Sequence, residues 1–212
     1  KDAGFDTPRL FVDGDSDTES WRREFGLEVT SHYPKIRTYG NWVLALAELY
    51  IRDPWADRFA IFQDDFVTYK NLKSYLDEYE MPEKGYWNLY TFPKNQVRIP
   101  EDHKGWWVSN QKGLGALALI FSRDAVTTLL HSLHMIERPK DVFRGWRAVD
   151  GGIVTSMNKA GYKEYVHSIS LVQHLGIISS MGTPTMPLAT SFRGERYDAT
   201  ELIKEFINAE TT

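Results

Sequence analysis

The chain has 212 residues, which is enough for one sizeable domain built around a single core. Hydrophobic residues make up 42% and charged residues 25%, as in ordinary globular proteins, and the net charge of −4 argues against a general binder of polyanions. Because cysteine is absent, disulfide scaffolds, thiolate zinc sites and cysteine nucleophiles are excluded. The lack of cysteine and of a recognisable signal peptide favours the cytoplasm, and no apolar stretch reaches the roughly 20 residues that would span a membrane.

The first part of the chain alternates short apolar runs with turn signals. Leu10–Val12 predicts a buried strand that ends at Asp13-Gly14, and the acidic segment Gly14–Ser20 predicts a surface loop. Apolar residues at helical spacing then predict a helix capped by Asn41 that ends before Asp53-Pro54. The uninterrupted apolar run Phe59–Phe62 predicts a central strand that is covered on both faces.

The middle of the chain predicts one helix, one strand and one irregular segment. Asn71–Tyr79 carries its large apolar side chains on one helical face. Tyr86–Phe92 is rich in aromatic residues and is bounded by glycine and proline, which is typical of a strand. The polar segment Val97–Asn110 is expected to be irregular, with Trp106-Trp107 exposed.

The second part continues the alternation. Ala116–Phe121 predicts a buried strand, and Ser122 is expected to cap a helix over Arg123–Leu133. A helix over Ile153–Ala160 and a strand over Tyr165–Ile169 follow, and a last helix begins near Asp198, with Glu201 placed for a capping box. Alternating strands and helices predict a layered α/β sheet.

Two adjacent carboxylates follow the buried strand Phe59–Phe62, in the triplet Gln63-Asp64-Asp65. Ligands of open α/β sheets gather outside the carboxyl ends of strands, and a hard divalent cation would relieve the repulsion between two carboxylates there. The alternative is a polar turn in which one aspartate caps the next segment.

Three further positions are chemical candidates. Asp150, followed by Gly151 and Gly152, could take a proton from a hydroxyl that approaches the backbone closely, or it could simply be an N-cap. His174 follows a predicted strand and is either a metal ligand or a hydrogen-bonded structural histidine. Trp107 could stack on a sugar or cover the sheet.

The order of these segments resembles that of nucleotide-sugar-dependent glycosyltransferases of the GT-A fold. The most specific segment is similar to the Ser-Leu-x-Gln-His-x-Gly pattern of branching N-acetylglucosaminyltransferases of the type IV kind. The segments that carry the resemblance are Leu10–Gly14, Phe62–Asp65, Gly113–Ala116, Asp150–Gly152, Ser170–Gly176 and Ser179-Ser180.

The resemblance implies a single GT-A-like, Rossmann-like α/β domain with a mostly parallel central sheet covered by helices. The family's first strand and helix are expected to lack a counterpart before Lys1. Residues 1–110 would form the nucleotide-sugar-binding half of this domain, and residues 111–212 the acceptor-side half. The segment Gly113-Leu114-Gly115 is not a dinucleotide fingerprint, because a strand rather than a helix is predicted after it.

The resemblance also implies a role for each candidate residue. Asp65 and His174 would hold a divalent metal, Mn²⁺ or Mg²⁺, and Asp150 would be the base that deprotonates the acceptor. Gln63 stands where the family has a carboxylate. The implied binding residues are Asp13, Gly14, Asp64 and Gly115 for the donor, and Trp107 and Gly151 for the acceptor.

The implied activity is the metal-dependent transfer of a hexosyl or N-acetylhexosaminyl group from a nucleoside diphosphate sugar, expected to be a UDP-sugar, with inversion. The acceptor hydroxyl could belong to a glycan, a small molecule, a protein or a modified nucleic acid. One open alternative is a sugar-nucleotide or nucleotidyl transferase, which also uses carboxylates at strand ends and a cation. The other is a carbohydrate- or nucleotide-binding module without catalysis, which Gln63 slightly favours.

Overall fold

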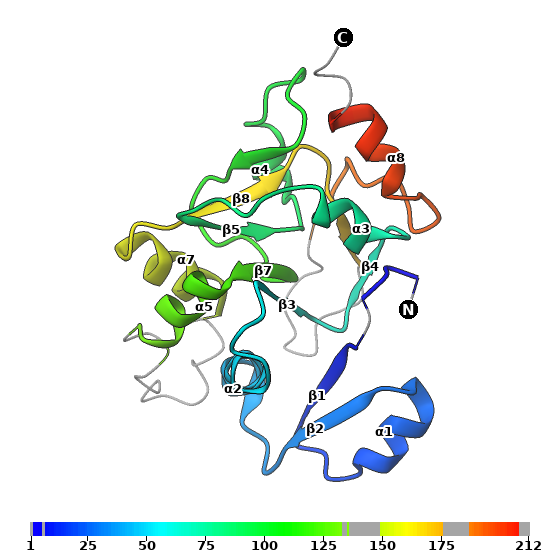
Figure 1. The fold of residues 1–212 in the computed structure, drawn as a ribbon, viewed down its shortest axis with the longest axis vertical. Helices are drawn as coiled ribbons and strands as arrows, with labels where there is room; N and C mark the ends of the chain where they lie inside the picture. Colours follow the sequence, from blue (N-terminus) through cyan, green and yellow to red (C-terminus); the bar gives the residue numbers. More distant parts are fainter. Residues whose placement is uncertain (1, 6, 133–134, 136–148, 176–186, 208–212) are drawn as a thin grey trace.

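The structure is a computed structural model that describes residues 2–5, 7–132, 135, 149–175 and 187–207. Strands and helices alternate along the chain, which confirms the α/β class (Figure 1). The strands are β1 (Arg9–Asp13), β2 (Glu28–His32), β3 (Arg58–Phe62), β4 (Phe66–Thr68), β5 (Gly85–Asn88), β6 (Trp106–Val108), β7 (Ala118–Ser122), β8 (Lys163–His167) and β9 (Val172–His174). The helices are α1 (Thr18–Phe25), α2 (Arg37–Arg52), α3 (Leu72–Asp77), α4 (Pro93–Gln96), α5 (Arg123–Leu130), α7 (Val149–Lys159), α8 (Thr200–Leu202) and the π-helical turn η2 (Ile203–Ile207).

The central sheet has five strands in the order β3-β7-β5-β8-β6. Only the β5–β8 pairing is parallel, whereas β3–β7, β5–β7 and β6–β8 are antiparallel, so the prediction of a mostly parallel sheet is wrong. The reason is the position of β7, which inserts in the reverse direction between β3 and β5. These pairings leave β3, β5 and β8 running in one direction, and their carboxyl ends therefore share one edge of the sheet with the beginnings of β6 and β7.

Strands from both proposed halves of the chain alternate in this sheet. The strands β3, β5 and β6 come from residues 1–110, whereas β7 and β8 come from residues 111–212. The two halves therefore share one sheet, and their assignment to donor and acceptor stays a prediction.

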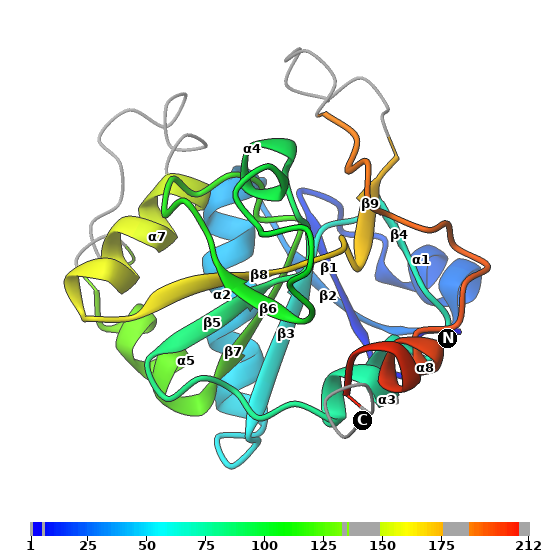
Figure 2. The ribbon, with the colours of Figure 1, turned by 90° about the horizontal axis from the view of Figure 1, so that it is seen from above.

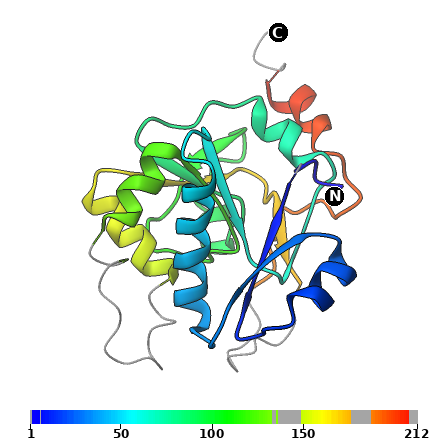
Figure 3. The same ribbon diagram turned by 60° about the horizontal axis from the view of Figure 1, so that its bottom comes forward.

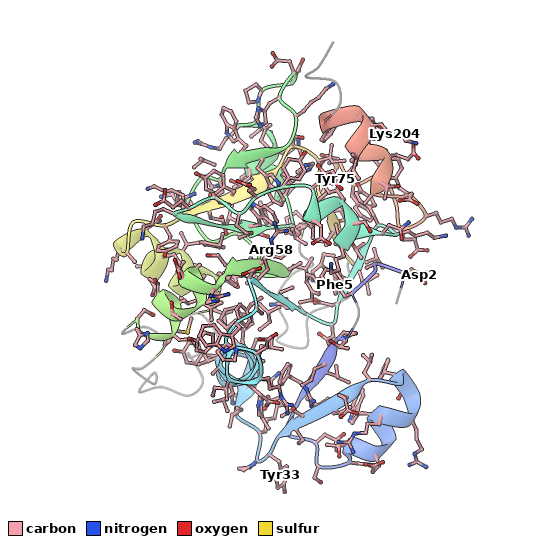
Figure 4. The ribbon with its side chains drawn as sticks, in the orientation of Figure 1. Asp2, Phe5, Tyr33, Arg58, Tyr75 and Lys204 are labelled. Carbon is pink, nitrogen blue, oxygen red and sulfur yellow. The ribbon has the colours of Figure 1, made fainter. Side chains whose placement is uncertain are left out.

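Helices cover both faces of the central sheet (Figures 2 and 3). On one face α2, α5 and α7 pack over a core that contains Trp42, Leu46 and Phe121. On the other face α3 and α8 enclose a second core with Tyr75, Trp87 and Leu202. In Figure 4, Tyr75 lies among the side chains of the interior, whereas Tyr33, which is 69% exposed, projects outward near β2. The continuous apolar run of β3 contacts both cores, because alternate residues of a strand point to opposite faces. The prediction that this strand is central is wrong, because β3 is an edge strand that pairs only with β7 in the five-stranded sheet.

A small unit of β1, α1 and β2 stands beside the central sheet (Figure 1). The strands β1 and β2 pair in parallel, so the strand predicted at Leu10–Val12 is confirmed. The predicted loop Gly14–Ser20 is wrong at its end, because α1 begins at Thr18. The side chain of Asp17 accepts a hydrogen bond from the Ser20 N–H, and this cap starts the helix inside an acidic segment.

Several predicted boundaries are corrected by tertiary contacts. Asn41 is not an N-cap but lies inside α2, where its side chain donates to the Phe11 carbonyl and joins α2 to β1. The predicted irregular segment contains the edge strand β6, because Trp106 stacks on the Trp87 ring of β5. The cap at Ser122 is confirmed, since its hydroxyl accepts from the Ala125 N–H.

Two predicted features lie in the last part of the chain: a helix that begins near Asp198, and the segment around Gly176 and Ser179-Ser180. The N-cap of α8 is Ala199, without a side-chain cap, and the side chain of Asp198 one residue earlier accepts from the Thr200 N–H at 2.9 Å. The predicted capping box is wrong, because the Glu201 side chain pairs with Lys204. Gly176 and the pair Ser179-Ser180, which contribute to the family resemblance, lie outside the described residues. Among the described helices, none has the length and apolar character to cross a membrane.

Candidate functional site

Asp65 and His174 are brought together by the short antiparallel pairing of β4 with β9. In this pairing Phe66 lies opposite His174, and the Leu175 N–H donates to the Asp65 carbonyl at 2.9 Å. The His174 Nε2 atom lies 3.0 Å from Asp65 Oδ2. These two residues, more than a hundred positions apart in the sequence, therefore lie side by side, but neither lines the described pocket that Asp150 lines.

The surroundings of this pair suit a cation. His174 is buried, and Asp65 Oδ1 is also buried and has no hydrogen-bond partner among the described residues. A buried carboxylate oxygen without a partner is costly, and a cation bound to it would remove that cost. The 3.0 Å between Oδ2 and Nε2 is the distance of an ion pair or hydrogen bond, so a cation bound by both atoms would replace the proton between them.

The described residues contain no cluster of three or more histidine, aspartate or glutamate side chains suited to a metal. Mg²⁺-like ions are commonly held by one or two carboxylates together with substrate phosphates and water. Imidazole nitrogen and carboxylate oxygen suit Mn²⁺ as well. Asp65 and His174 offer one carboxylate oxygen and one imidazole nitrogen, which are ligand types that such ions accept.

Asp150 lies in the first turn of α7, which begins at Val149 rather than at the predicted Ile153. Burial raises the pKa of the Asp150 carboxyl, while hydrogen bonds from the backbone N–H groups of Gly115 and Ala116 lower it. The positive end of the helix dipole also favours a negative charge in the first turn. Asp150 is therefore a half-buried residue whose carboxylate is held by backbone donors, and burial raises its pKa from the ordinary value toward the neutral range, where a general base works best.

The segment before β7 connects the surroundings of Asp65 with those of Asp150. The Gln63 N–H, close to Asp65, donates to the Leu117 carbonyl at 2.8 Å. Two residues earlier in the chain, Gly115 donates to Asp150. Both sites lie at the edge where β3 ends and β7 begins, as expected for a ligand site of an α/β sheet.

Two buried polar residues that the sequence analysis missed lie next to Asp150. Asn88 on β5 and Glu164 on β8 are both buried, and Asn88 Nδ2 donates to the Gly115 carbonyl at 2.8 Å and to Glu164 Oε1 at 3.2 Å. Together with Tyr86 and Gly113, Glu164 and Asp150 line one small pocket. The sequence carried one signal for Glu164. Side chains alternate between the two faces of a strand, so Glu164 lies on the same face of β8 as the apolar Val166.

The remaining predicted residues have different surroundings. Asp13 Oδ1 accepts from the Ile36 N–H at 2.7 Å, and Gly14 has a φ of 82° with Lys35 packed against it, so both shape the connection from β2 to α2. Asp64 is exposed beside Asp65. A role of these three residues in donor binding stays a prediction.

The predicted acceptor residues are Trp107 and Gly151. Trp107 is half-buried on the edge strand β6, where its ring meets His103 at a centroid distance of 4.8 Å. Because Trp106 stacks on Trp87, Trp107 points to the opposite face of the sheet, the face that carries Glu164. Gly151 follows Asp150 in α7, and a Cβ atom at this position would meet no atom within 4 Å.

The two glycines around Asp150 provide a matched pair of substitutions. A Cβ atom at Gly113, where φ is 62°, would lie 2.6 Å from the Asp150 carbonyl oxygen and 2.8 Å from Gly151 Cα, so Gly113→Ala is expected to displace the start of α7. Gly151→Ala has open space and should stabilise the helix by up to about 1 kcal/mol. Urea unfolding of both variants checks this, and equal stability of the two would contradict the close approach at Gly113.

A comparison with models of known protein families found no match, and neither did a comparison with curated proteins.

Proposed function

We propose that the chain is a metal-dependent glycosyltransferase that moves a sugar from a nucleoside diphosphate sugar, a UDP-sugar by preference, to an acceptor hydroxyl with inversion. The observation that carries the proposal is the pair Asp65 and His174, with Oδ2 and Nε2 3.0 Å apart and a buried Oδ1 that has no hydrogen-bond partner in the described part of the chain. The class of acceptor stays open among glycans, small molecules, proteins and modified nucleic acids.

Asp65 and His174 would hold the metal at the leaving-group end of the site. Breaking the bond between the anomeric carbon and the diphosphate leaves negative charge on the diphosphate, and a bound Mn²⁺ or Mg²⁺ would neutralise that charge. The exposed carboxylate of Asp64 lies next to this position and is available to hydroxyl groups of the donor. This arrangement favours a diphosphate donor over an uncharged one.

Asp150 would act at the acceptor. As the acceptor oxygen forms its bond to the anomeric carbon, the hydroxyl proton passes to the Asp150 carboxylate, and the electron pair of the broken bond leaves with the diphosphate. The pKa of Asp150, raised by burial, gives the carboxylate more affinity for that proton than an exposed aspartate has. Gly151, without a side chain, would leave room for an acceptor close to the helix start.

The test is a thermal-shift panel of nucleoside diphosphate sugars with and without Mn²⁺, followed by measurement of nucleotide release. At 100 times its dissociation constant, a donor should stabilise the protein by roughly 2.7 kcal/mol, and we expect this only when Mn²⁺ is present. Release of nucleoside diphosphate from the stabilising donor should also depend on Mn²⁺. No stabilisation by any donor with Mn²⁺ would refute the proposal.

The same panel separates the two alternatives. A donor that binds in the presence of Mn²⁺ but is neither hydrolysed nor transferred would favour the binding module, in line with Gln63 at the usual carboxylate position. Stabilisation by a nucleoside triphosphate together with a sugar phosphate, with release of pyrophosphate, would favour a nucleotidyl transferase.

A further inference from the structure

Glu164 is a buried carboxyl group with one oxygen left unpaired. Its side chain is on β8, the residue is 2% exposed, and Oε2 has no hydrogen-bond partner among the described residues. Its backbone is fixed on both sides, because the Gln111 side chain donates to its carbonyl at 2.8 Å and accepts from its N–H at 3.2 Å. The position of Glu164 is thus rigidly defined, and the unpaired Oε2 needs either a proton or a partner.

Glu164 and Asp150 line the same small pocket. They are also linked through Asn88, whose Nδ2 donates to Glu164 Oε1 and to the Gly115 carbonyl, while the Gly115 N–H donates to Asp150. The two carboxyl groups therefore share one backbone segment as well as one cavity. Two carboxyl groups that lie close together and are largely shielded from water cannot both ionise cheaply.

The groups that face this pair offer no compensating positive charge. Among the described residues that line the pocket, the only titratable ones are Asp150 on α7, Glu164 on β8 and Tyr86 on β5, and none is a lysine, arginine or histidine. From β7, Leu119 contributes an apolar wall. The Tyr86 hydroxyl is buried next to Glu164, and burial followed by the Glu164 charge raises the pKa of Tyr86, so this side chain stays neutral.

Glu164 and Asp150 differ in how well a negative charge is stabilised. Burial is the largest effect on both groups and raises the pKa of each. Asp150 accepts hydrogen bonds from three backbone N–H groups at a helix start, those of Gly115, Ala116 and Asp150 itself. Glu164 is hydrogen-bonded only by side chains, Ser109 and Asn88 first, which lower its pKa, while the neighbouring Asp150 charge raises it. The negative charge therefore belongs to Asp150, and the proton to Glu164.

We propose that Glu164 is a neutral carboxylic acid that acts as a positioning residue for Asp150. Glu164 keeps one proton in the shared pocket, so the single negative charge is on Asp150. Through Asn88, Glu164 also fixes the Gly115 backbone. That Asp150 then serves as a base rests on the function proposed above. The pairing of a protonated with an ionised carboxyl group does not depend on that function.

The first test measures the proton of Glu164 without using any activity. Glu164→Gln keeps the shape and the acceptor for Asn88 but cannot ionise, so the variant should fold and should lose the infrared band of a protonated carboxylic acid that the wild type has at neutral pH. Because the pKa of Glu164 is raised in the folded state, wild-type stability falls as the pH rises through that value. The stability gained by Glu164→Gln should therefore increase with pH.

The control for this test is Glu201→Gln, which removes an exposed glutamate paired with Lys204 and should change neither the infrared band nor the slope of stability with pH. A Glu164→Gln variant whose stability differs from wild type by the same amount at every pH would overturn the proposal. If the variant does not fold, the wild-type band alone decides, because its absence at neutral pH contradicts a protonated acid in this pocket.

The second test asks whether the two carboxyl groups act on each other. Asp150→Asn removes the neighbouring negative charge, so the infrared band of the Glu164 acid should titrate at lower pH than in the wild type. A purely structural Glu164 would titrate at the same pH in both proteins, and this outcome would overturn the positioning role. If only the proposed glycosyltransferase function is wrong, Asp150→Asn would still move the titration of the Glu164 band to lower pH, but the wild-type protein would transfer no sugar.

Discussion

Asp150→Asn is expected to reduce sugar transfer by on the order of 10²–10⁴-fold while donor binding is retained. The asparagine keeps an oxygen that can accept from Gly115 and Ala116, but it cannot take up the acceptor proton. The measurement is the rate of transfer at saturating donor, together with the Mn²⁺-dependent thermal shift. Transfer at the wild-type rate would eliminate Asp150 as the base.

The pH dependence of the free energy of unfolding gives a second measurement for Asp150→Asn, and its direction can be predicted. Since burial raises the folded-state pKa of Asp150, the ionised carboxylate lowers wild-type stability as the pH rises through that value. The variant should therefore gain stability relative to wild type with increasing pH. Asp124→Asn is the matched control, because Asp124 lies in the first turn of α5 but is exposed, and this variant should retain full transfer activity.

Asp65→Ala is expected to weaken Mn²⁺ binding by at least about 100-fold, since loss of even an outer contact to a metal ligand costs 10–100-fold. Both the Mn²⁺-dependent stabilisation by donor and the release of nucleotide should disappear. His174→Ala should have a similar effect, because Asp65 Oδ2 and His174 Nε2 lie 3.0 Å apart and would bind the same ion. Thermal shift over a Mn²⁺ titration measures all of these effects.

The double variant distinguishes a shared ion from two independent structural roles. If Asp65 and His174 hold one metal, Asp65→Ala combined with His174→Ala should lose little more Mn²⁺ affinity than either single variant. His131→Ala is the control for the loss of a histidine, because His131 is exposed at the end of α5. Unchanged Mn²⁺ dependence in Asp65→Ala would remove Asp65 from the metal site.

Local sequence signals were sufficient where a contact is made within a few residues. The cap of Ser122 on the Ala125 N–H spans three residues, and the end of α2 before Asp53-Pro54 is set by the proline itself. The burial of β3 on both faces was also readable from its unbroken apolar run. In the same way, a polar pair directly after a buried strand marked the position of Asp65.

Strand direction could not be read in this way. A buried apolar run such as Ala116–Phe121 has the same pattern whether its neighbours are parallel or antiparallel, so the reversed insertion of β7 was missed. The strand β6 was missed for a related reason. Its three residues form a strand by pairing with β8, and the Trp106 ring stacks on the Trp87 ring of β5; both contacts are with residues distant in the sequence.

The amino-acid sequence by itself determined the α/β class, several helix ends and the separate positions of Asp65, Asp150 and His174, because local backbone preferences and apolar periodicity act over a few neighbours. Only the tertiary structure decided that Asp65 meets His174 and that Asp150 shares a pocket with Glu164. These contacts join segments that are distant in the chain or belong to different elements, and they depend on strand order and register. Burial, which moves the pKa values of Asp150 and Glu164, exists only after the sheet and α7 have packed together.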